Sequence, residues 1–82
     1  MKITVHNFIN KLFDAEAKEV ILPGEDGELS VLNFHQACLY SLRPGQVKVI
    51  AGRPGEDAEM RFPLKKGLAK IAPDKVVVLI EE

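Results

Sequence analysis

The amino-acid sequence predicts an all-β domain, arranged as an antiparallel sandwich or barrel. Two observations support this: the second half carries short alternating or β-branched segments, and turn signals separate them at regular intervals. Short strands at such spacing are typical of antiparallel sandwiches and barrels. The 82 residues suffice for a single domain over residues 1–82.

The strand signals are clearest after residue 45. Residues 46–49 and 59–62 alternate polar and apolar side chains, which predicts two half-buried strands. Residues 75–80 form a β-branched run suited to a strand buried on both faces or nearly so. Turn-forming residues at 52–57, 65–67 and 72–74 separate these segments from one another.

The first half is less clear from periodicity. Apolar residues between positions 8 and 22 recur at helical spacing, which taken alone predicts an amphipathic helix there. Residues 31–42 carry a partly helical pattern as well. The apolar residues of the first segment are Phe8, Ile9, Leu12, Phe13, Ala17, Val20 and Ile21.

Residues 23–45 are bracketed by two expected turns. Pro23-Gly24 and Pro44-Gly45 are turn dipeptides, because proline presets φ and glycine accepts a positive φ. Gly27 adds a third point of backbone freedom. An acidic turn lies at Glu25, Asp26 and Glu28, and a single histidine, His35, lies further along.

The motif P-G-x-x-G-E-L-x-V-L-x-x-H, followed seven residues after the histidine by L-x-P-G, resembles a known family. It is similar to the amino-terminal domain of the epsilon subunit of F-type ATP synthases, which is called delta in mitochondria. Residues 62–79 resemble the closing pattern of that family: an aromatic strand, a glycine pair, an apolar strand, a turn and a valine-rich strand. The likeness covers roughly residues 13–80.

The resemblance implies a flattened barrel or sandwich of about ten short antiparallel strands. It implies strands near residues 2–8, 12–13 and 17–22 and extended structure through 31–42, so we expect strands where periodicity favours helices. Two departures stand out. Lys66 occupies the first position of the family's glycine pair, and the C-terminal helical hairpin of family members is absent from this sequence.

For function, the resemblance implies a non-catalytic central-stalk subunit of the rotor. Such a subunit binds the gamma subunit and the membrane c-ring, and couples proton or sodium flow to ATP synthesis. Without the hairpin, we expect it to lack the brake on ATP hydrolysis. It would be peripheral, on the cytoplasmic face of the bacterial inner membrane, and monomeric when isolated. The expected gamma interface comprises Asn33, Phe34, His35, Gln36 and Tyr40, and the expected c-ring interface comprises Gly24, Glu25, Asp26, Gly27 and Glu28.

The sequence offers no catalytic, cofactor or metal site. His35 has no base, acid or second ligand at a recognisable spacing, and Cys38 is the only cysteine. No run of apolar residues is long enough to insert into a membrane, and the net charge of −1 without a basic stripe disfavours nucleic-acid binding. Two alternatives stay open: a free-standing interaction module that has changed partner, and a small β-barrel that binds nucleic acid or carbohydrate.

Overall fold

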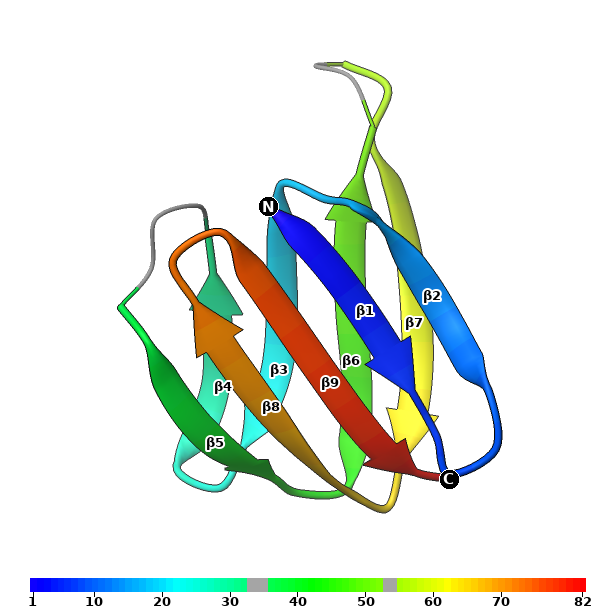
Figure 1. Ribbon diagram of the computed structural model, residues 1–82, viewed down its shortest axis with the longest axis vertical. Helices are drawn as coiled ribbons and strands as arrows, with labels where there is room; N and C mark the ends of the chain where they lie inside the picture. Colours follow the sequence, from blue (N-terminus) through cyan, green and yellow to red (C-terminus); the bar gives the residue numbers. More distant parts are fainter. Residues whose placement is uncertain (33–35, 53–54) are drawn as a thin grey trace.

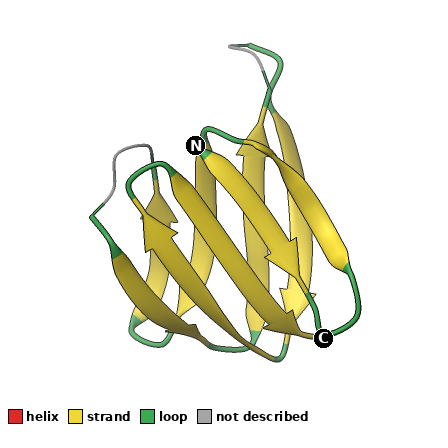
Figure 2. Ribbon diagram, viewed as in Figure 1, coloured by secondary structure: helices red, strands yellow, loops and turns green. Residues whose placement is uncertain are grey.

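The computed structural model describes residues 1–32, 36–52 and 55–82, and these ranges contain nine strands and no helix (Figure 2). The all-β prediction is confirmed, with nine strands in these ranges where about ten were expected. In chain order the strands are β1 (Lys2–His6), β2 (Lys11–Glu16), β3 (Glu19–Gly24), β4 (Gly27–Val31), β5 (Cys38–Leu42), β6 (Gly45–Ala51), β7 (Ala58–Leu64), β8 (Lys66–Ala72) and β9 (Lys75–Glu81).

The strands form one continuous sheet that folds over into two layers. Its order is β2-β1-β9-β8-β5-β3-β6-β7, and β4 pairs with β3. In Figure 1, β5, β8, β9, β1 and β2 form the front layer, and β4, β3, β6 and β7 lie behind it. Every pairing is antiparallel except that of β1 with β9, which is parallel. The predicted sandwich is therefore confirmed, with one parallel pair joining the first and last strands.

The core lies between the two layers and is made of β-branched and leucine side chains. Alternate residues of β9, such as Val76 and Val78, are fully buried against it. Between them Val77 is half-buried and Leu79 is 39% exposed. The expectation that residues 75–80 are buried on both faces is therefore wrong, because the outer face of the front layer has no third layer over it.

Residues 8–22 form parts of two strands rather than a helix, so the strand prediction is confirmed and the helical periodicity was misleading. β2 ends at Glu16 and β3 begins at Glu19. The corner between the two strands offsets the alternation of apolar residues in β3 from that in β2. Phe8 and Ile9 belong to the loop before β2 and are 76% and 87% exposed. The helical spacing thus arose from residues that never share one buried face.

The two ends of the sheet meet through an aromatic contact. Phe13 on β2 and Phe62 on β7 have ring centroids 6.0 Å apart at an angle of 58°. Tilted rings at this separation attract each other beyond the effect of burial alone. Because β2 and β7 do not pair by hydrogen bonds, this contact links the two layers at the open side of the sandwich.

The departure at Lys66 has no visible consequence for the sheet. Lys66 is exposed, begins β8 and pairs with Glu81, so the turn before it is reduced to Lys65. Gly67 needs to be small, since a Cβ atom there would lie 2.7 Å from the Leu79 carbonyl oxygen. The second glycine of the family pair is therefore required by close packing, while a side chain is accommodated at the first position.

Candidate functional site

The acidic turn lies at the tip of the β3–β4 hairpin. Gly24 pairs with Gly27 across the hairpin, so Glu25 and Asp26 form its two-residue turn. Gly27 has a φ of 127°, a conformation that side chains rarely adopt, and this confirms the freedom expected there. A Cβ atom on Gly24 would lie 2.8 Å from the Gly27 carbonyl oxygen, so this position also requires glycine.

The prediction that both Pro-Gly dipeptides form turns with a positive φ is wrong. Gly24 ends β3 and Gly45 begins β6, and neither has a positive φ. The turns lie one step away, at Glu25-Asp26 and at Arg43-Pro44. The glycines serve close packing instead, because a Cβ atom on Gly24 would lie 2.8 Å from the Gly27 carbonyl oxygen and one on Gly45 would lie 3.0 Å from the Pro23 Cβ atom.

The two layers join at one corner beside the hairpin. Gly24 is the only residue of β3 with a register partner on β5, and that partner is Leu42. The Arg43 backbone N–H then donates a hydrogen bond of 2.8 Å to the Pro23 carbonyl oxygen. These contacts hold the end of β5 against the hairpin, so the turn and β5 have a fixed relative position.

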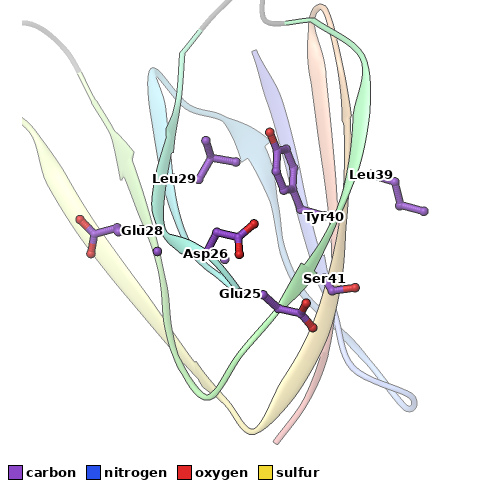
Figure 3. A pocket seen from close by; sticks show the side chains of 9 residues that line it. Glu25, Asp26, Glu28, Leu29, Leu39, Tyr40 and Ser41 are labelled. Carbon is purple, nitrogen blue, oxygen red and sulfur yellow. The ribbon is translucent and has the colours of Figure 1, made fainter.

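A cleft of about 330 Å³ lies between the hairpin and β5. In Figure 3, Leu29 and Tyr40 face each other across it, and the Asp26 carboxylate projects into the same space. Leu39 and Glu28 point away from it. Tyr40 is 36% exposed, so its ring is accessible from the cleft. The lining residues are Gly24, Glu25, Asp26, Gly27, Glu28, Leu29, Leu39, Tyr40 and Ser41.

The cleft carries the negative charges of Glu25 and Asp26. Within the described ranges, the carboxylates of Glu25, Asp26 and Glu28 take part in no ion pair. All three side chains are exposed. The ion pairs of the described residues lie elsewhere and join Met1 to Glu16, Lys2 and Lys11 to Asp14, Lys18 to Asp57, and Arg61 to Glu59.

The carboxyl group of Asp14, which lies outside the cleft, has a lowered pKa. The Lys11 ammonium donates a hydrogen bond of 3.0 Å to Asp14 on β2, and this bond holds the pKa of Asp14 below its ordinary value. Among the described residues no group of three or more His, Cys, Asp or Glu side chains could hold a metal ion. The cleft places exposed carboxylates beside the side chains of Tyr40 and Leu29, which suits binding of a partner by charge and apolar contact.

The structure brings together only part of the predicted gamma interface. Tyr40 lines the cleft, and Gln36 is exposed just before β5. Asn33, Phe34 and His35 lie outside the described residues. The predicted c-ring residues are contiguous on the hairpin, as expected, but Figure 3 divides them: Asp26 faces Tyr40, whereas Glu28 points to the opposite side.

Sequence reasoning missed a row of exposed apolar residues on the outer face of the front layer. Leu68 and Leu79 pair across β8 and β9 and are 44% and 39% exposed. Leu39 on β5 is 67% exposed, and Phe8 lines a small groove beside Leu68 and Leu79. The alternation of residues 66–70 carries the signal, because the register that buries Ala69 puts Leu68 outside.

The Phe8-Ile9 loop is held by its neighbour Asn7. The Asn7 Oδ1 atom accepts hydrogen bonds from the backbone N–H of Ile9 at 2.9 Å and of Asn10 at 2.6 Å. Such an Asx turn fixes a loop without burying its side chains. Phe8 therefore lies outside the core although its side chain is a large aromatic ring.

No helix among the described residues is long and apolar enough to cross a membrane.

Comparison with known proteins gives a consistent result. The family model of the "ATP synthase, Delta/Epsilon chain, beta-sandwich domain" matches residues 1–82. The ATP synthase epsilon chain of Neisseria meningitidis is 31% identical over 81 residues, covering 99% of this chain and 56% of that protein. The epsilon chain of Bordetella avium is 38% identical over 68 residues, covering 83% and 46%. The chain thus spans about half the length of the curated relatives it matches.

Two solved structures have the same fold. A chain of the Tetrahymena thermophila mitochondrial ATP synthase, central stalk and c-ring, superposes with a TM-score of 0.81 at 15% identity, covering 99% of this chain and 63% of that one. A chain of the Euglena gracilis mitochondrial ATP synthase, OSCP, F1 and c-ring, gives a TM-score of 0.83 at 20% identity, covering 98% and 49%.

Proposed function

The chain belongs to the family of ATP synthase delta/epsilon chain β-sandwich domains, and we propose that it serves as a non-catalytic central-stalk subunit of an F-type ATP synthase rotor. In this role it binds the gamma subunit and the c-ring, so that rotation driven by proton or sodium flow is coupled to ATP synthesis. It acts as a peripheral part of the complex, on the cytoplasmic face of a bacterial inner membrane.

The family match over the whole chain is the observation that carries this proposal. The Tetrahymena structure with the same fold is one of the central stalk and c-ring, which supports a place in that part of the complex. The exposed hairpin at residues 24–28 and the accessible Tyr40 supply surfaces for two partners. A coupling element must also resist deformation, and a close-packed sandwich core meets that need.

Direct binding tests the proposal. We would immobilise the 82-residue chain and measure its binding to the purified gamma subunit and to the detergent-solubilised c-ring of the same organism. We expect saturable binding to both. Tyr40→Ala should weaken gamma binding roughly tenfold, because exposed aromatic residues at interfaces are frequent binding hot spots. Glu56→Gln, at an exposed residue just before β7, should leave both affinities unchanged, because Figure 1 shows the start of β7 at the opposite end of the molecule from the β3–β4 turn.

Failure would have a definite meaning. If the folded chain binds neither probe, the rotor role is wrong and the free-standing interaction module becomes the leading reading. The exposed row of Leu39, Leu68, Leu79 and Phe8 favours that second candidate, because monomeric proteins seldom expose neighbouring large apolar side chains without a partner.

A further inference from the structure

We propose that the two sides of the β3–β4 hairpin bind different partners, and that the cleft on its Tyr40 side receives a lysine or arginine side chain of the gamma subunit. The inference rests on the proposed rotor function and refines it. The acidic turn would then not contact the c-ring as a whole, because Asp26 would bind gamma and Glu28 would bind the c-ring.

The first step is the orientation of the carboxylates. In Figure 3 the Asp26 side chain points into the cleft toward the Tyr40 ring, and Glu25 lies at its lower end near Ser41. Glu28 is the first residue of β4 whose side chain points away from the cleft, while Leu29 points into it. Because successive side chains of a strand alternate between faces, one partner surface cannot contact Leu29 and Glu28 equally well.

The second step is the difference in charge between the two sides. Glu25, Asp26 and Glu28 line the cleft, although the Glu28 side chain turns away from it, and no lysine, arginine or histidine of the described residues lines it. The opposite side of the hairpin is a shallow groove in which Glu28 lies beside Arg43 and Lys48. Among the described residues, the charged side chains of the cleft are therefore all acidic, whereas the groove has two cationic side chains and one carboxylate. Surfaces of such different potential complement different partners.

The third step is the chemistry of the cleft. The exposed Tyr40 ring and the half-buried Leu29 side chain give it an apolar wall. Carboxylates stand at one end of this wall and have no ion-pair partner within the described residues. A lysine or arginine side chain matches both parts, since its aliphatic stem packs on an apolar wall and its charged head bonds to a carboxylate. The face of a tyrosine ring adds a cation–π attraction.

The fourth step assigns the partner. Tyr40 is one of the residues that the family resemblance assigns to the gamma surface, and it lines the cleft, so we assign the cleft to the same proposed interface. The groove on the other side contains the polar side chains of Glu28, Gln46 and Lys48, which suit the polar loops proposed for the c-ring. The hairpin would thus stand between stalk and ring, with one face toward each.

The experiment measures the binding of four variants to gamma and to the c-ring separately. We expect Asp26→Asn and Tyr40→Ala each to weaken gamma binding roughly tenfold and to leave c-ring binding unchanged. We expect the double variant to lose less than the hundredfold that independent sites would give, because both residues contact the same basic side chain. Glu28→Gln should weaken c-ring binding alone, by a few fold. A thermal melt of each variant verifies that the fold is retained.

Salt dependence supplies a second readout. Gamma binding by the wild type should weaken as sodium chloride is raised, and Asp26→Asn should reduce the slope of that dependence. Two outcomes would overturn the two-sided hairpin while the rotor role still holds, provided that the wild type binds both probes. In the first, Asp26→Asn weakens c-ring binding. In the second, the losses of gamma binding caused by Asp26→Asn and Tyr40→Ala are strictly additive. Absence of any binding by the folded wild type overturns the rotor role itself, and the inference falls with it.

Discussion

The centre of the front layer and the corner beside the β3–β4 hairpin differ in burial and in polarity. At the centre, β1 and β9 pair in parallel, and their inward side chains, including Ile3, Val5 and Val78, are completely buried. At the corner a single register pair joins the layers, and the neighbouring turn carries exposed carboxylates. The molecule therefore separates the residues that hold it together from those that are free to bind.

The largest loss of stability should come from truncating a buried side chain at the centre of the front layer. Ile3→Ala removes a side chain with no exposed surface and is expected to lower the free energy of unfolding by about 2–5 kcal/mol. The matched control is Ile9→Ala, because Ile9 is 87% exposed and its truncation should change stability by less than about 0.5 kcal/mol. Urea unfolding followed by circular dichroism measures both. Similar losses in the two variants would contradict the contrast drawn between centre and surface.

An intermediate effect is expected at the corner. Gly24→Ala introduces a Cβ atom 2.8 Å from the Gly27 carbonyl oxygen, so the hairpin must shift, at a cost of about 1–3 kcal/mol in stability. The same shift moves the turn relative to Tyr40, so gamma binding should weaken by more than the loss of stability alone explains.

Glu25→Ala is the control for backbone strain in the same hairpin, since its side chain is exposed and without an ion pair in the described ranges. It should leave unfolding within about 0.5 kcal/mol of the wild type. If Gly24→Ala matches this control in stability and binds gamma as tightly as the wild type does, the corner tolerates a side chain and is not a fixed junction.

The same contrast explains what the sequence could predict. The β-branched run at residues 75–80 and the alternation at 46–49 and 59–62 reflect burial in the centre, and strands formed at each place. Burial of one face of a strand requires apolar residues at a regular spacing, and that spacing can be recognised in the sequence. The helical spacing at residues 8–22 misled because Phe8 and Ile9 project from a loop fixed by Asn7.

The corner was only partly predictable. The glycines and the acidic turn were visible, but the meeting of Tyr40 and Asp26 depends on how the sheet folds over between β5 and β3. Those two residues are 14 positions apart, and no periodicity links them. The parallel pairing of β1 with β9 was hidden for the same reason, because contacts between distant segments leave no local pattern.

The smallest expected effect concerns the exposed ion pairs on the outer face of β1 and β2. The hydrogen bond from Lys11 lowers the pKa of Asp14 below its ordinary value, and the nearby charges of Lys11 and Lys2 act in the same direction. A carboxyl group whose pKa is depressed by folding stabilises the folded protein above its unfolded pKa and loses that contribution as the pH falls through its folded pKa. Wild type and Asp14→Asn should therefore differ in urea midpoint near pH 6 and converge as the pH is lowered below about 4.

Sodium chloride at about 1 M should shrink the difference seen near pH 6, because exposed ion pairs are screened by salt. The expected size is well below that of Ile3→Ala, since Asp14 is exposed and water competes for the same charges. A difference that instead widens in acid, or that rivals the loss from Ile3→Ala, would mean that surface charge on β2 contributes to stability on the scale of the buried centre. The division between a core that holds the sandwich together and a surface available for binding would then fail at this strand.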